Sequence, residues 1–258
     1  MSTAVPAALI AQLRAAGCVF AEEEAALLVE AAADPVRLAE LTDRRVSGEP
    51  LEQVLGWVDF DGLRLHLRPG VFVPRQRTTF LVQTATELAP DGAAVADVCC
   101  GIGAIAAALA ARRPDLQLVA SDVDPVAVAA ARENLPARVG VTCGDLLEAL
   151  PLRWRGTLAL VVANTPYVPT GEIPGLPPEA RVHEPPATLD GGADGLDVQR
   201  RLAQQAGAWL APGGRVLTEI VAAQAETAVA AFQAAGFDAR VRISQEWGSG
   251  VLVAQLLP

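Results

Sequence analysis

The chain has 258 residues, a hydrophobic content of 52% and a formal net charge of −10. This length and apolar content allow one sizeable domain with its own core, plus a smaller unit. All of its cations are arginines, which excludes Schiff-base chemistry on a lysine and a phosphate loop that requires one. The acidic balance also argues against non-specific binding to nucleic acid, which needs a basic surface.

The sequence shows no membrane span, no signal peptide and no metal-binding pattern. No apolar run reaches the length of a span, and no basic segment precedes an apolar one at the N-terminus. Four cysteines without a Cys-x-x-Cys spacing, beside two histidines, do not favour a zinc site. We therefore expect a cytoplasmic protein without a metal and without a membrane partner.

Residues 1–50 predict a small helical domain. Apolar positions recur at helical spacing through residues 5–15 and 22–33. Asp34-Pro35 then supplies an N-cap followed by proline at the first position of a third helix. No side chain here is equipped for chemistry, so the domain is better suited to be a lid, a dimer contact or a docking surface for a substrate.

Residues 51–72 predict a β-hairpin that links the helices to the main domain. Leu63, Leu65 and Leu67 alternate with polar residues, which is the period of a strand, and Asp61-Gly62 supplies turn residues. A helix is expected after residue 75 and runs to about residue 88.

The main domain, residues 73–258, alternates predicted strands and helices. Strands are expected at 94–98, 117–121, 139–142, 158–163 and 215–220, with two closing strands near 239–244 and 250–257. Helices are expected at 102–111, 125–134, 196–210 and 222–235. This alternation predicts an α/β fold with a mostly parallel, doubly wound sheet of seven strands. Residues 168–195 do not fit the pattern, and their length and proline content favour an active-site loop.

The strand at 158–163 ends in Asn164-Thr165-Pro166-Tyr167. A buried strand that stops there delivers a side-chain amide and free backbone carbonyls to the carboxyl edge of the sheet. Open α/β sheets bind their ligands at that edge. The alternative is a structural turn in which asparagine and proline only end the strand.

A glycine loop follows the first strand of the sheet, with the sequence Cys99-Cys100-Gly101-Ile102-Gly103. Glycine allows a tight turn and a close approach of the backbone to a ligand, and the next helix offers free N–H groups. The spacing Gly-x-Gly-x-x-Ala also fits a dinucleotide fingerprint, so a nicotinamide-dependent oxidoreductase stays open as an alternative.

Three carboxylates stand near successive strand ends: Asp97, Asp122 and Asp145. Asp97 would repel a pyrophosphate but suit a sulfonium or an ammonium group. Asp122 can accept hydrogen bonds from both hydroxyls of a ribose, and Asp145 can reach an adenine amine. Each aspartate alone could equally cap a helix. Together they favour a cationic adenosyl ligand, S-adenosylmethionine, over NAD.

Further motifs complete a family pattern, which runs from about residue 48 to the end of the chain. They are Gly48-Glu49-Pro50-Leu51, Phe72-Val73-Pro74-Arg75, the 97–103 loop, Asp122, Asp145, residues 164–167 and His183-Glu184-Pro185. The pattern resembles the protein-(glutamine-N5) methyltransferases, which methylate the glutamine of the Gly-Gly-Gln motif in peptide-chain release factors. The corner at 164–167 is shared with adenine-N6 methylases, whereas the flanking Pro-Arg and Glu-Pro segments are typical of the glutamine branch.

The resemblance implies a Rossmann-like class I S-adenosylmethionine-dependent methyltransferase fold, with a helical N-terminal domain and a hairpin. It implies methyl transfer to an amide nitrogen of a protein substrate, most simply a release factor. The implied catalytic residues are Asn164, Thr165, Pro166 and Tyr167. The implied cofactor contacts are Asp97, Cys99, Cys100, Gly101, Ile102, Gly103, Asp122, Val123, Asp145, Leu146 and Asn164. The implied substrate contacts are Phe72, Pro74, Arg75, Asn164, Tyr167 and Glu184.

The sequence departs from the family pattern at several positions. The family usually has glycine at the position of Cys99 and often proline at that of Thr165, and its Pro-Arg-Pro-Asp-Thr-Glu stretch reads Pro-Arg-Gln-Arg-Thr-Thr at residues 74–79. These departures leave open another protein, a peptide or a small molecule as the substrate. An adenine methylase is disfavoured by the acidic charge, an oxidoreductase by Asp97, and a non-catalytic docking module by Asn164.

Overall fold

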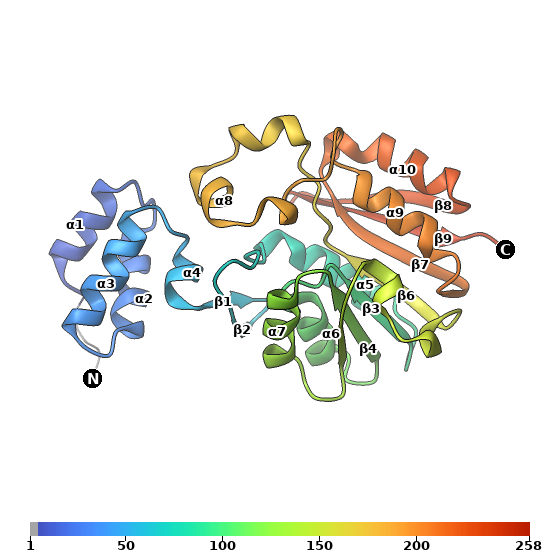
Figure 1. Ribbon diagram of the computed structural model, residues 1–258, viewed down its shortest axis with the longest axis horizontal. Helices are drawn as coiled ribbons and strands as arrows, with labels where there is room; N and C mark the ends of the chain where they lie inside the picture. Colours follow the sequence, from blue (N-terminus) through green and yellow to red (C-terminus); the bar gives the residue numbers. More distant parts are fainter. Residues whose placement is uncertain (1–4) are drawn as a thin grey trace.

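The computed structural model describes residues 5–258, and the N-terminal helices stand apart from a large sheet covered by helices (Figure 1). The helices are α1 (Ala7–Ala15), α2 (Ala21–Ala31), α3 (Pro35–Val46) and α4 (Leu51–Leu55). α3 begins as the sequence predicts, because the side chain of Asp34 accepts a hydrogen bond from the Arg37 N–H at 2.8 Å. Leu13, Leu28 and Leu41 are buried in a small core of their own.

The hairpin consists of β1 (Trp57–Phe60) and β2 (Leu63–His66), which pair in antiparallel register. Val58, Phe60 and Leu65 are buried in a core of the main domain, and Arg64 forms an exposed ion pair with Glu30 of α2 at 3.3 Å, so the hairpin contacts both parts of the chain. The segment just before it differs from the expectation, because residues 51–55 form α4. Gly56 ends this helix with a φ of 78°, and five residues are too few to give a helical period in the sequence.

The main sheet has seven strands in the order β5-β4-β3-β6-β7-β9-β8. β3 to β7 pair in parallel, and β9 lies antiparallel between β7 and β8, which confirms the predicted mostly parallel, doubly wound sheet. The strands are β3 (Ala94–Val98), β4 (Gln117–Asp122), β5 (Gly140–Cys143), β6 (Leu158–Ala163), β7 (Leu210–Ile220), β8 (Phe237–Ser244) and β9 (Ser249–Leu256). β7 begins five residues earlier than predicted, and its pairing with β6 shifts register between Leu158 and Leu160.

Helices cover both faces of the sheet (Figure 1). They are α5 (Thr79–Leu88), α6 (Ala104–Arg112), α7 (Pro125–Asn134), α9 (Asp197–Ala206) and α10 (Ala225–Ala234). Successive residues of a strand face opposite sides, so Val95 joins the core under α5 and α6 while Ala96 joins the core under α9 and α10. A strand buried on both faces needs an apolar run, which is why β3 and β6 were visible in the sequence.

Residues 168–195 are not a structureless loop. They contain two short 3-10 helices, at 170–175 and 186–188, and the helix α8 (Pro178–His183). The segment lies between the N-terminal helices and the main domain (Figure 1), and Glu179 of α8 forms an ion pair with Arg45 of α3 at 2.8 Å. Within residues 5–258, no helix is both long and apolar enough to cross a bilayer.

Candidate active site

The candidate site lies where the strand order reverses. The chain passes from β3 outward to β4 and β5, and then returns to β6 on the other side of β3. Ligands of open α/β sheets bind outside the carboxyl ends of the strands at such a point. Asp97 near the end of β3, Asp122 at the end of β4 and Asn164 just after β6 therefore share one edge.

Asp122 holds the glycine loop in place. One carboxylate oxygen accepts a hydrogen bond from the Gly101 N–H at 2.8 Å, and the other accepts from the Asp124 N–H at 2.9 Å. Burial raises the pKa of Asp122, although these N–H groups oppose the shift. Each oxygen keeps lone pairs with which it can accept a further hydrogen from a ligand.

Asp97 lies beneath the loop and is fully buried. Its Oδ2 accepts a hydrogen bond from the Ala106 N–H at 3.0 Å, in the first turn of α6. Its Oδ1 is buried and has no hydrogen-bond partner in the described part of the chain. Burial raises the pKa of Asp97 to about 8. A buried acceptor without a partner is costly, so this oxygen is suited to a donor supplied by a ligand.

The glycine loop turns through three left-handed residues: Cys99 (φ 56°), Gly101 (φ 55°) and Gly103 (φ 79°). A Cβ at Gly103 would meet Leu135 at 3.0 Å, whereas one at Gly101 would meet no atom of residues 5–258 within 4 Å. Gly103 is therefore needed for packing, and Gly101 faces open space where a ligand can approach the backbone. Cys99 adopts a conformation that favours glycine, which gives a physical reason for the family's glycine there.

The other expected cofactor residues have different surroundings. The side chains of Cys100, Ile102 and Leu146 are buried in the core, so they can offer only backbone groups. Val123 is exposed. The carboxylate of Asp145 forms an ion pair with Arg201 of α9, so any contact with an adenine amine would be shared with that cation.

The amide of Asn164 is oriented by one hydrogen bond. Its Nδ2 donates to the Thr78 hydroxyl at 3.3 Å, and its Oδ1 is buried without a partner among residues 5–258. Thr165 is 1% exposed, and its hydroxyl likewise has no partner in the described chain. The corner after β6 therefore holds an oriented acceptor that has no partner within residues 5–258.

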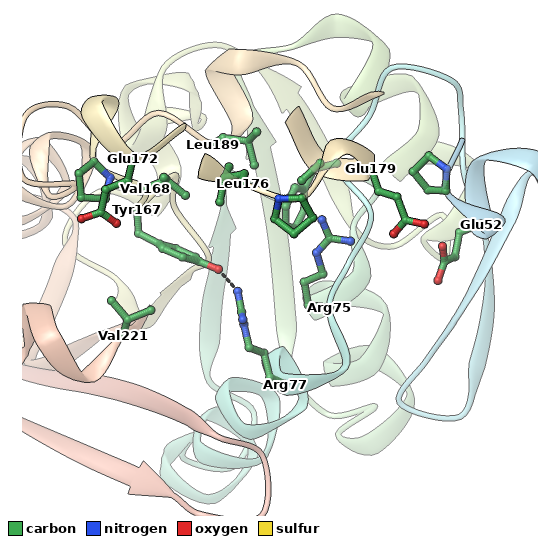
Figure 2. Close-up of a pocket in the computed structure, with 15 residues that line it drawn as sticks. Glu52, Arg75, Arg77, Tyr167, Val168, Glu172, Leu176, Glu179, Leu189 and Val221 are labelled. Atoms are coloured by element: carbon green, nitrogen blue, oxygen red, sulfur yellow. Dashed lines mark hydrogen bonds between the residues drawn. The ribbon is translucent and has the colours of Figure 1, made fainter. Parts of the chain in front are cut away.

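Two adjoining cavities open beside this corner. The larger, about 530 Å³, is lined by residues of α4, the 72–77 segment, Tyr167 and α8 (Figure 2). The smaller, about 30 Å³, is lined by Asn164 and Thr165. Phe72, Tyr167, Val168 and Leu189 line both cavities. The catalytic and substrate-binding residues expected from the sequence are thus brought together, with three exceptions.

Pro74, Pro166 and Glu184 line neither cavity. The side chain of Glu184 is fully buried and accepts hydrogen bonds from Arg75 at 2.7 Å and from the Val73 N–H at 3.3 Å. Arg75, in contrast, lines the larger cavity, and its guanidinium lies 5.1 Å from the Phe72 ring centre. Glu184 therefore does not face the cavity but holds Arg75 in position through this ion pair.

Arg77 and its partner Glu219 were not predicted from the sequence as site residues, but they also belong to the site. Arg77 lines the larger cavity, and its Nε donates to the buried carboxylate of Glu219 at 3.0 Å. Its Nη2 donates to the hydroxyl of Tyr167, the contact drawn as a dashed line in Figure 2. The sequence signal for Arg77 is that this arginine departs from the family pattern at residues 74–79. Its partner Glu219 lies 142 residues away along the chain, so no local pattern indicates the pair.

The sheet order, the glycine loop and the acceptor at the end of β6 define a class I S-adenosylmethionine-dependent methyltransferase fold. A family model for the methyltransferase small domain matches residues 62–173. A methyltransferase from Pyrococcus furiosus superposes with a TM-score of 0.57 at 17% identity, over 75% of this chain and 89% of that one. A ribosomal protein L11 methylase from Lactobacillus delbrueckii subsp. bulgaricus gives 0.52 at 20% identity, over 74% and 84%.

Sequence identity is higher to one group of enzymes than to these two solved structures. A release factor glutamine methyltransferase from Geobacter sulfurreducens is 41% identical over 200 residues, which are 76% of this chain and 69% of that protein. One from Bradyrhizobium diazoefficiens is 39% identical over 213 residues, or 79% and 70%. The chain belongs to the release factor glutamine methyltransferase family.

Proposed function

We propose that this enzyme transfers a methyl group from S-adenosylmethionine to the N5 amide nitrogen of the Gly-Gly-Gln glutamine of a peptide-chain release factor. The observation that supports this most strongly is the buried, partner-free Oδ1 of Asn164 within residues 5–258, held by Thr78 beside two adjoining cavities. The family membership supports the same substrate.

The residues present fit the cofactor. The open space beside Gly101 leaves room for a ligand, and Asp122 next to it has lone pairs for ribose hydroxyls. The free Oδ1 of Asp97, which lacks a partner in the described chain, suits a hydrogen-bond donor such as an ammonium group. S-adenosylmethionine would supply an electrophilic methyl group on a sulfonium and leave as a neutral thioether.

The chain's task is to orient a weak nucleophile. An amide nitrogen shares its lone pair with the carbonyl, so attack requires the nitrogen to become pyramidal. The Oδ1 of Asn164 and the main-chain carbonyl of Thr165 can each accept one N–H of the substrate amide, which turns the lone pair toward the methyl group. As positive charge builds on the nitrogen, both hydrogen bonds strengthen, and this stabilises the transition state more than the ground state. The methylated nitrogen then becomes neutral by releasing one N–H proton to water.

The shape of the site suits a peptide segment. A cavity of about 530 Å³ lies in the range of small-ligand sites, and its walls come from both the helical domain and the main domain. The smaller cavity, about 30 Å³, adjoins the larger one and is lined by Asn164. Phe72, Tyr167 and Leu189 line both cavities, so they would flank a glutamine side chain that extends from the larger cavity to Asn164.

The test is methyl transfer from radiolabelled S-adenosylmethionine to a purified release factor, with mass spectrometry of the peptide that carries Gly-Gly-Gln. We expect one methyl group on the glutamine, and no labelling of a release factor in which that glutamine is alanine. Equal labelling of the two release factors, or none of either, would contradict the proposal.

A further inference from the structure

Tyr167 stands between the two cavities, and its hydroxyl is held by one side chain. The residue lines both the wide cavity and the narrow one that contains Asn164. The Nη2 of Arg77 donates to its hydroxyl, and the guanidinium carbon lies 5.6 Å from the ring centre. Figure 2 shows the two side chains reaching toward each other from different segments of the chain.

Arg77 is itself fixed from the other side. Its Nε donates to the carboxylate of Glu219, which is on β7 and has a side chain only 3% exposed. β7 pairs with β6, and Thr218 is in register with Ala163, so Glu219 is anchored in the sheet next to the Asn164 corner. One planar guanidinium thus joins a buried anchor to the tyrosine, a geometry that a single ammonium group does not reproduce.

We propose that Arg77 is a positioning residue for the protein substrate, because it holds Tyr167 in the orientation that shapes the passage from the wide cavity to Asn164. The inference takes its substrate from the proposed function, whereas the contact between Arg77 and Tyr167 does not depend on that function. Arg77 acts through Tyr167, so losing it should impair use of the protein substrate and leave cofactor binding nearly unchanged.

The placement of Tyr167 can be measured without any substrate. Tyr167 is the only tyrosine in the sequence, so tyrosine labelled with ¹³C at Cζ gives one NMR signal. We expect this signal to shift in Arg77→Lys and Arg77→Gln. The positive charge of Arg77 lowers the pKa of Tyr167 against the effect of burial, so the titration midpoint should rise in Arg77→Gln.

Arg242→Gln is the matched control for the NMR comparison. Arg242 is an ion-paired arginine of β8 that bonds Glu87 at 2.9 Å and lines neither cavity. Its loss should leave the Tyr167 signal where it is in the wild type. An unchanged signal and midpoint in Arg77→Gln would overturn the inference.

Kinetics then test what the contact does. Arg77→Lys keeps a cation near Glu219, so the variant should fold, but an ammonium group cannot bond Glu219 and Tyr167 in the geometry of the guanidinium. We therefore expect kcat/KM for the release factor to fall about tenfold, the scale of one charge-assisted hydrogen bond. The KM for S-adenosylmethionine should stay within about twofold. In a Tyr167→Phe background the same change should cost less than about twofold, because coupled residues are not additive.

Two kinetic results would overturn the inference: a full tenfold loss from Arg77→Lys in the Tyr167→Phe background, or an equal loss in the KM for S-adenosylmethionine. If the wild type leaves the release factor unmethylated, the proposed function fails. The NMR comparison still decides in that case whether Arg77 positions Tyr167.

Discussion

Three aspartates that look alike in the sequence have three different surroundings. Asp122 binds the backbone of the glycine loop, Asp97 lies buried against the first turn of α6, and Asp145 pairs with Arg201. The sequence predicts that they stand at strand ends, because strand period and turn residues are local signals. Their partners are set by the packing of distant segments, so the sequence does not distinguish a loop anchor from a free ligand contact.

Asp122→Ala should weaken S-adenosylmethionine binding by about 1.5–3 kcal/mol, the range for hydrogen bonds to a charged group. The loss has two sources, since the change removes the acceptor for the ribose and releases the Gly101 N–H. Calorimetry measures it directly. Asp124→Ala is the control, because Asp124 caps α7 through the Val126 N–H and should change the affinity little. Equal losses in the two variants would contradict the role of Asp122.

Thr165→Pro should leave kcat within about threefold, well below the loss expected when a preorganised group is removed. Only the main-chain carbonyl of Thr165 is used in the proposed chemistry, and its buried hydroxyl has no partner in the described chain. Residues before proline are already held in the extended region, as Thr165 is by Pro166. A loss above tenfold in steady-state kcat would instead indicate that the hydroxyl contacts the substrate.

At the scale of elements, α7 connects the hairpin to the glycine loop through hydrogen bonds. Asn134 at its end accepts a hydrogen bond from the His66 N–H at 2.8 Å, and donates to the carbonyls of His66 at 2.9 Å and Ile102 at 3.0 Å. Three hydrogen bonds from one side chain thus join α7, β2 and the cofactor loop.

Asn134→Ala should lower the free energy of unfolding by about 1.5–4.5 kcal/mol, taking about 0.5–1.5 kcal/mol for each of the three hydrogen bonds. Urea denaturation measures the change. Glu133→Ala is a suitable control, because the neighbouring Glu133 forms an exposed ion pair with Arg68, and its loss should cost less than about 1 kcal/mol. Similar costs for the two variants would argue against this connecting role.

The elements that the sequence predicted share a long, regular pattern. The apolar runs of β3 and β6 and the Asp-Pro starts of α3 and α7 are visible because they need no partner to be recognised. α4 and α8 are too short for a helical period, and prolines around α8 suggested a loop. The Arg77–Glu219 pair depends on the assembled sheet, because no local sequence pattern joins the short 3-10 helix Gln76–Thr78 to β7.

At the scale of the whole molecule, stability should depend on the proton of Asp97. Its pKa in the folded protein is about 8, above the value of about 3.9 in an unfolded chain. The folded state therefore binds this proton more tightly. The contribution of this proton to the free energy of unfolding is complete below about pH 4 and is lost as the pH rises toward 8.

Asp97→Asn removes this titration and is the variant for comparison. The free energy of unfolding of the wild type minus that of Asp97→Asn, measured without cofactor, should fall between pH 5 and pH 8. A difference that stays flat or rises over this range would show that Asp97 is ionised in the folded protein throughout.

The acidic balance of the molecule predicts little affinity for duplex DNA. With a net charge of −10 and no lysine, the chain should show no micromolar binding at 0.15 M salt. Fluorescence anisotropy with a labelled duplex at several salt concentrations tests this. Micromolar binding with a steep dependence on salt would favour an adenine methylase.

The central claim is that the amide of Asn164 orients the substrate nitrogen, and single-turnover methylation of a release factor tests it most directly. Asn164→Ala should lower the rate roughly 10²- to 10³-fold, by analogy with the loss of one preorganised hydrogen bond in an oxyanion hole. Asn164→Asp should retain more activity than alanine, because it keeps an acceptor and attracts the developing cation. Affinity for S-adenosylmethionine should change much less. Full activity in Asn164→Ala would contradict the account.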